Sequence, residues 1–198
     1  MLVDSRVTGQ ADDARFAFRS DRLALDFAAT LMFREPPRHA RELLTDRRAL
    51  ARWAVAAQLL DVAPVRLSPV ALDDAVELRE AIYGAASALA RGEPLPPRSL
   101  ATLNVHAAGR PVTVALSERG ALTRSGSLRQ VLASVARDAI ELFGGADATR
   151  VRQCARAGCT RLFVDRTRGQ TRVWCGMREC GNRVNAAAYR RRRAAAES

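Results

Sequence analysis

The sequence predicts an α+β protein built from two parts, a mostly helical N-terminal domain with a small β-hairpin and a small cysteine-bearing C-terminal module. Three observations predict this class. Apolar residues recur at helical spacing through most of the first three quarters of the chain. One short stretch alternates apolar and polar residues, as a strand does. All four cysteines and most of the net charge fall in the last quarter.

The first two elements are expected to be helices. The apolar run "RLALDFAATLMF" (22–33) favours a buried helix that ends before Pro36 and Pro37. A second helix begins at a cap candidate, Thr45 or Asp46. Its apolar residues then follow at helical spacing, and they are Leu50, Trp53, Ala57 and Leu60.

The third helix has the clearest start and stop signals. Ser68 is the expected N-cap, Pro69 occupies the first helical position, and Gly92 ends the helix. Its predicted buried stripe is Leu72, Val76, Ile82, Ala86 and Leu89. The proline-rich stretch 94–97 is a stiff connector to a short helix that ends at Gly109.

A hairpin and a last helix complete the N-terminal domain. Val112, Val114 and Leu116 alternate with other residues before the turn "SERG", which predicts a β-hairpin. Ser127 then caps the helix "LRQVLASVARDAIELFGG", whose inward residues are expected to be Val131, Val135 and Leu142. Two glycines end it, which places the boundary between residues 1–145 and residues 146–198.

The charge of the chain is divided unequally between these parts. Residues 150–198 hold 13 arginines and three carboxylates, a formal charge of +10, out of +11 for the whole chain, which has no lysine. Such asymmetry indicates an appended module with an anionic partner. Neither a signal peptide nor a membrane-spanning run is found, so a cytoplasmic protein is expected.

The cysteines form two equal pairs, Cys154-x4-Cys159 and Cys175-x4-Cys180, separated by fifteen residues. Pairs with such a gap are typical of a closed tetrahedral site, and in a reducing compartment they bind metal more readily than they form disulfides. The spacing favours one structural Zn²⁺, with an iron–sulfur cluster and two disulfides as alternatives. With zinc bound to four thiolates, the module keeps a charge of about +8.

The rest of the module suggests how the pairs are presented. "RLFVD" (161–165) and "TRVWC" (171–175) predict a hairpin around the turn "RTRGQ", and "NRVNAAAYRRRR" (182–193) predicts a helix. A glycine-assisted knuckle, a hairpin and a second ligand pair at a helix start together resemble the treble-clef group of zinc folds.

Two segments carry a family resemblance. "WCGMRECGNR" (174–183) resembles the signature of the CGNR zinc-finger proteins, as do the two cysteine pairs and "RLFVDRTR" (161–168). "LALDFAAT" (23–30) is similar to the opening of the ABATE domain that accompanies this finger, although Ala29 stands where that motif has Asn. The resemblance implies a stress-induced transcription regulator that binds DNA.

Arginines flank the predicted zinc site on both sides. Those expected to bind DNA are Arg183, Arg190, Arg191, Arg192 and Arg193 on the helix, and Arg166, Arg168 and Arg172 at the hairpin turn. Solvated, disordered charge is the alternative, above all for the last three helical arginines. Residues expected to support the finger are Gly181, Asn182 as a helix cap, and Trp174 and Phe163 as an aromatic core.

Two classes of function follow from these features. The first is a zinc-dependent regulator whose finger binds double-stranded DNA and whose N-terminal domain senses an effector or forms a homodimer. The second is an adaptor whose basic finger docks on an acidic protein. An enzyme is not expected, because no catalytic constellation occurs and the cysteines are committed to metal. The sequence leaves the effector and the oligomeric state open.

Overall fold

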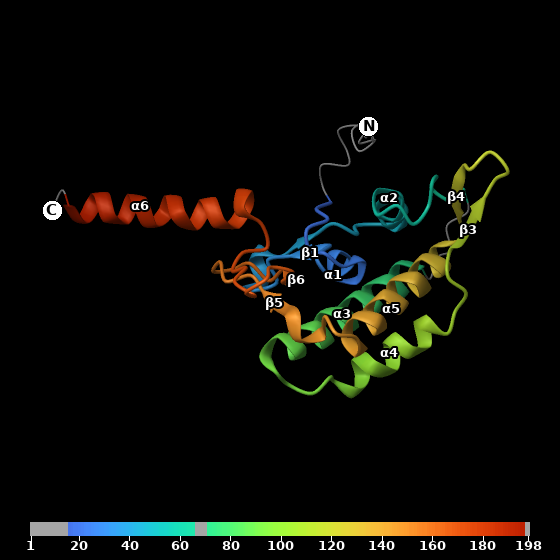
Figure 1. The fold of residues 1–198 in the computed structure, drawn as a ribbon, viewed down its shortest axis with the longest axis horizontal. Helices are drawn as coiled ribbons and strands as arrows, with labels where there is room; N and C mark the ends of the chain where they lie inside the picture. Colours follow the sequence, from blue (N-terminus) through green and yellow to red (C-terminus); the bar gives the residue numbers. More distant parts are fainter. Residues whose placement is uncertain (1–15, 66–70, 197–198) are drawn as a thin grey trace.

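The computed structural model describes residues 16–65 and 71–196 and confirms the α+β class. Figure 1 shows a helical body from which one helix projects. The α-helices are α1 (Leu23–Ala28), α2 (Arg47–Ala56), α3 (Ala71–Arg91), α4 (Pro97–Ala107), α5 (Leu128–Gly144) and α6 (Asn182–Ala196). The strands are β1 (Leu31–Met32), β2 (Arg41–Glu42), β3 (Thr113–Leu116), β4 (Leu122–Ser125), β5 (Val151–Gln153) and β6 (Leu162–Val164), and the short helical turns are η2 (Pro37–His39), η3 (Ala148–Arg150) and η4 (Met177–Gly181).

Three long helices form the body. Helices α3, α4 and α5 lie side by side and pack on one another, and α1 packs across α3 and α5 (Figure 1). Their apolar faces meet in one continuous core around Leu78, Ile82 and Val135, all fully buried. The strands contribute only two-stranded antiparallel sheets, β1–β2, β3–β4 and β5–β6.

The cap residues confirm most of the predicted helices. The side chain of Asp46 accepts a hydrogen bond from Ala49 N, so Asp46 is the cap of α2 and Thr45 is not. Ser127 and Gln130 form a complete capping box at the start of α5. Gly92 follows α3 with a φ of +72°, a backbone conformation that glycine adopts without strain. Ser68 and Pro69 lie outside the described residues.

The prediction of one helix over residues 22–33 is wrong. Helix α1 ends at Ala28, and Leu31–Met32 instead pairs as β1 with β2. Hydrogen bonds from Ala29 N to Leu25 O and from Thr30 Oγ1 to Phe27 O close the helix early. An apolar run this short does not distinguish a helix from a helix followed by a strand, because both would be buried.

The expected hairpin at residues 112–125 forms as β3 and β4. Its strands are almost entirely exposed, including Val114, Leu116 and Leu122. It therefore extends from the body as an arm (Figure 1) and adds nothing to the core.

The hairpin of the C-terminal module is not the one expected. Strand β6 (Leu162–Val164) pairs with β5 (Val151–Gln153), and residues 171–175 form no strand. Pairing β6 with the preceding segment places the first cysteine pair at the tip of the hairpin. The chain after β6 is held instead by the carboxylate of Asp165, which accepts from the N–H groups of Thr167 and Arg172.

The apolar core crosses the boundary predicted at residues 145 and 146. Val151, Leu162 and Val164 are buried in the same cluster as the helices of the body, and both strands pack on α3. One face of the β5–β6 hairpin therefore belongs to the body, while Phe163 on the other face belongs to the cysteine cluster. The boundary itself stays a prediction. Among the described residues, no helix has the length and hydropathy needed to span a membrane.

The shared core predicts that a small cavity in the hairpin weakens the whole body. Val164→Ala should lower the free energy of unfolding by about 2 kcal/mol, because the removed methyl groups are fully buried. Thermal unfolding followed by the fluorescence of Trp53, in the core of the body, measures this effect. Val173→Ala is the matched control, because Val173 is about half exposed. An unchanged midpoint for Val164→Ala would mean that the body folds independently of residues 146–198.

Candidate metal centre and nucleic-acid interface

The four cysteines converge on one point. All four are buried, and their Sγ atoms all lie within 4.8 Å of one another. The shorter separations are 3.5 Å from Cys175 to Cys180, 3.8 Å from Cys180 to Cys159 and 3.9 Å from Cys159 to Cys175. None of the four forms a disulfide.

These separations fit a tetrahedral zinc ion. Four Zn–S bonds of about 2.3 Å place the sulfur atoms about 3.8 Å apart at tetrahedral angles. A disulfide would require about 2.05 Å between two of them, well below any of these distances. The cluster is a structural zinc site, as predicted, because four thiolates leave no coordination position open.

Four thiols held this closely cannot all ionise unless a cation lies between them. Hydrogen bonds from Cys159 and Cys175 hold the pKa of Cys154 far below its ordinary value. The same contact with Cys154 raises the pKa of Cys159 to about 11 and raises that of Cys175 further. Zn²⁺ resolves the conflict, because it stabilises all four thiolates at once and releases their protons.

Each ligand pair has its own support. Cys154 and Cys159 lie at the tip of the β5–β6 hairpin, where Gly158 has a φ of +76°. Cys175 precedes η4, and Cys180 lies within it, directly before α6. At Gly181 a Cβ atom would lie 2.6 Å from Met177 Sδ and 3.1 Å from the ring of Trp174, so a larger residue there would displace the Met177 side chain.

The two predicted aromatic residues pack against the cysteine cluster. Phe163 is fully buried among the four cysteines, and Trp174 packs against the same cluster while staying partly exposed. Asn182 is exposed at the start of α6, without the predicted capping hydrogen bond among the described residues.

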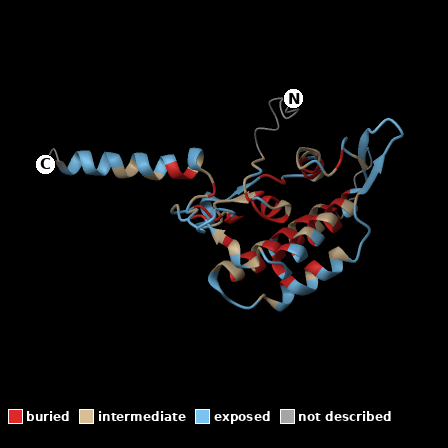
Figure 2. Cartoon of the chain, in the orientation of Figure 1, coloured by how far each residue is buried: buried red, intermediate tan, exposed pale blue. Residues whose placement is uncertain are grey.

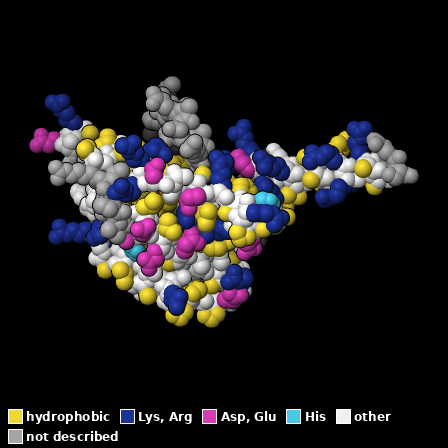
Figure 3. Space-filling model, turned by 180° about the vertical axis from the view of Figure 1, so that it is seen from behind, with side chains coloured by type: hydrophobic (Ala, Val, Ile, Leu, Met, Phe, Trp, Pro, Cys, Tyr) yellow, Lys and Arg dark blue, Asp and Glu magenta, His cyan; other side chains and the backbone are white. Residues whose placement is uncertain are grey.

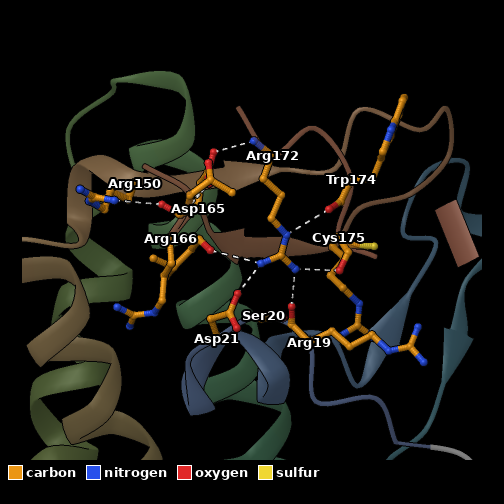
Figure 4. Close-up of polar contacts among 12 residues, drawn as sticks. Arg19, Ser20, Asp21, Arg150, Asp165, Arg166, Arg172, Trp174 and Cys175 are labelled. Atoms are coloured by element: carbon orange, nitrogen blue, oxygen red, sulfur yellow. Dashed lines mark hydrogen bonds and ion pairs between the residues drawn. The ribbon is translucent and has the colours of Figure 1, made fainter. Parts of the chain in front are cut away.

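Arg172 is partly buried and uses its donors within the protein. Its guanidinium donates to the carbonyl oxygens of Trp174, Cys175 and Arg19, and it pairs with Asp21 (Figure 4). It also lies 4.3 Å from the centre of the Phe163 ring. Its donors join the zinc site to the body, and the DNA contact expected of Arg172 stays a prediction. Spacing alone could not show these contacts, since exposed and internal arginines look alike in sequence.

Further polar contacts join the zinc finger to the body. Arg161 donates to Ala17 O and lies 3.5 Å from the buried carboxylate of Asp26. Arg19 pairs with Glu179. The N–H of Arg34 donates to Thr160 Oγ1.

Burial and hydrogen bonds act in opposite directions on the pKa of the two carboxylates at this junction. Desolvation raises the pKa of Asp26 despite hydrogen bonds from the N–H groups of Arg19 and Ser20. For Asp165, burial alone would raise the pKa, but the hydrogen bonds from Thr167 and Arg172 outweigh it and the pKa is lowered. The stabilisation by Asp165 is therefore present at neutral pH and is lost as the pH falls through that lowered pKa.

The structure identifies Arg156, which the sequence analysis did not single out. Arg156 lies between the first two ligands, and its Nη1 atom is 3.5 Å from Cys180 Sγ and 3.3 Å from Glu179 O. It thus links the hairpin tip to the start of α6. Its position between the two cysteines of a C-x4-C pair was the sequence feature that could have indicated this role.

Helix α6 carries the remaining predicted arginines away from the body (Figures 1 and 3). Figure 2 shows that it is exposed along most of its length. Within the described part of the chain, Arg183, Arg190, Arg191 and Arg192 form no ion pair with a carboxylate. Arg168 is likewise exposed, whereas Arg166 lies 3.0 Å from Asp147 with about half of its side chain in solvent.

The two parts of the chain match two family models. Residues 21–146 match the ABATE family, described as "Putative stress-induced transcription regulator". Residues 150–193 match the CGNR zinc finger, so both predicted resemblances are confirmed. No curated protein is significantly similar to this chain. Ala29, the departure from the expected ABATE motif, is buried at the end of α1, beside a cavity of about 80 Å³ that also touches Cys159 and Cys175.

Loss of one thiolate should release the metal. The wild-type protein should contain one Zn²⁺ per chain, and Cys175→Ser should lose it and unfold the finger, because a structural site with three thiolates is open and weak. Metal analysis and circular dichroism before and after chelator treatment measure both effects. Ala155→Ser, at an exposed position of the knuckle, should keep zinc and fold. A finger that stays folded after complete metal loss would contradict the structural role.

Removal of the Arg172 side chain should loosen the finger from the body. Arg172→Ala should cost about 2 kcal/mol of unfolding free energy, because several charge-assisted hydrogen bonds at a partly buried site are lost. Arg168→Ala, which removes the same charge from an exposed position of the same turn, should change stability by less than about 0.5 kcal/mol. Denaturant unfolding of both variants provides the comparison, and equal stabilities would remove Arg172 from this role.

Proposed function

Because the chain belongs to the ABATE family and carries a CGNR zinc finger, we propose that it is a regulator that binds double-stranded DNA through arginines of this finger. One observation carries the proposal. Helix α6 projects from the body and presents Arg183, Arg190, Arg191 and Arg192, which form no ion pair with a carboxylate among the described residues.

The dimensions of α6 suit a DNA groove. Its 15 residues span about 22 Å, and the major groove of B-DNA, about 12 Å wide, admits one α-helix. Three alanines at positions 186–188 keep the middle of the helix narrow. Every cation is a guanidinium, which binds phosphate oxygens and the edge of guanine in a bidentate manner.

The arginines divide into two roles in this proposal. Arg183 lies three residues after the ligand Cys180, so its backbone is fixed by the metal, which suits base recognition. Arg190, Arg191 and Arg192 lie further along the projecting helix and suit phosphate binding. Arg166 and Arg168, on the loop after β6, provide a second line of contact with the DNA backbone.

The body is assigned a supporting role. It holds the finger through the shared core and the junction arginines, and it is the part that would sense an effector or form a homodimer. No catalytic step is proposed, since the four thiols are used by the metal.

The proposal predicts strongly salt-dependent binding. If about six phosphates are neutralised, the logarithm of the affinity for duplex DNA should fall with the logarithm of salt concentration with a slope of about −5. Replacing Arg190, Arg191, Arg192 and Arg193 by alanine in the full-length protein should weaken binding to all duplexes alike and flatten that slope. Anisotropy titrations of a labelled duplex at several salt concentrations measure both quantities.

The control replaces four arginines of the body, Arg38, Arg47, Arg52 and Arg119, by alanine and changes the net charge by the same amount. This control should keep the slope of the wild-type protein. Absence of duplex binding even at low salt would reject the proposal and favour the docking of an acidic protein partner by the same helix.

A further inference from the structure

An open groove lies at the base of α6, between this helix and the first zinc knuckle. Its volume is about 420 Å³, in the range of pockets that hold small organic groups. Arg156, Arg183 and Arg191 line it, and Trp174 forms part of its wall. The floor is made of small apolar side chains, among them Ala157 and Ala187.

The lining combines three guanidinium groups with no carboxylate. The nearest acidic residue in sequence, Glu179, lies in η4 and is paired with Arg19 on the side of the body. The thiolate of Cys180 offsets part of the charge of Arg156, and the remaining positive charge of this concave site attracts an anion.

The zinc site fixes the geometry of the groove. Arg156 is held by its Nη1 contacts with Cys180 Sγ and Glu179 O, and no hydrogen bond engages its Nη2 among the described residues. Trp174 is fixed by its packing on the cysteine cluster. The two walls come from the two ligand pairs, so the metal sets the distance between them.

The groove also gives α6 a preferred face. Arg183, Ala187 and Arg191 follow one another at i, i+4 and i+8 and therefore share one side of the helix. Asn185, Tyr189 and Arg192 point to the opposite side by the same spacing. The arginines of α6 are therefore not equivalent, although in sequence they form one run.

We propose that this groove holds one sugar–phosphate segment of a DNA strand, with the phosphates on Arg156 and Arg191, the sugar on the alanine floor, and Arg183 beside the segment, where its guanidinium is left for the adjacent base. The inference rests on the proposed DNA binding and adds the site on the protein where one strand lies. An apolar floor under a cationic rim matches the two faces of a nucleotide backbone. Trp174 provides an aromatic surface at the edge of that segment.

The test compares two pairs of variants of the full-length zinc-bound protein. Ala157→Glu places a carboxylate in the groove, and Asn185→Glu places the same charge on the opposite side of α6; both positions are exposed. Arg191→Gln removes a positive charge inside the groove, and Arg119→Gln removes the same charge from the exposed turn between β3 and β4. The probe is a fluorescently labelled duplex at fixed salt concentration, and zinc content and melting temperature are measured for every variant.

The groove variants should bind the duplex about tenfold more weakly than their matched controls, because a like charge or a lost guanidinium acts directly on the bound phosphates. Duplex binding should also change the fluorescence of Trp174 in the wild-type protein and in Asn185→Glu, and less in Ala157→Glu at equal saturation. Equal affinities within each pair would overturn the proposal that the groove holds a DNA strand, and would leave the proposed DNA binding intact. Absence of duplex binding by the wild-type protein would overturn both proposals.

Discussion

The convergence of four thiolates on one metal ion is the constraint on which the C-terminal quarter depends. The ion joins two segments that share little apolar contact, the tip of the β5–β6 hairpin and the start of α6. The direction of α6, the position of Arg156 and the shape of the groove all follow from this junction. Around the cysteines, Phe163 and Trp174 are the large apolar residues of the described cluster, and the two knuckles depend on the metal for most of their order.

A second junction fixes the finger to the body. The inward face of the hairpin completes the core on α3, and Arg161 and Arg172 bridge to the segment that precedes α1. Apolar contact gives this junction its stability, and the buried charge pairs give it a defined orientation, because each guanidinium has few acceptable partners. A change in the body around α1 would therefore reach the zinc site through direct contacts rather than through a linker.

The sequence predicted the features that depend on local chemistry. Residues close together in the sequence determine the helix caps, such as Asp46 and Ser127, the metal ligands and the division of charge. It failed where partners are distant. The strand 151–153 is too short to show alternation, so "TRVWC" was preferred as the partner of β6. Arg172 resembles its exposed neighbours, and its role depends on Asp21 and Arg19, about 150 positions away. Arg156 became visible only when the two ligand pairs were brought together.

The isolation of α6 has a consequence for the energetics of binding. None of its described side chains from Asn182 to Arg190 is buried, and four consecutive arginines repel one another near its end. A single helix of about 15 residues without tertiary packing is close to the balance point between helix and coil in water. The metal supplies a nucleus at the first turn, and a polyanion would remove the repulsion along the rest. Complex formation would then include the ordering of the distal turns, so part of the binding energy would be converted into helix formation, with a favourable enthalpy opposed by a loss of conformational entropy.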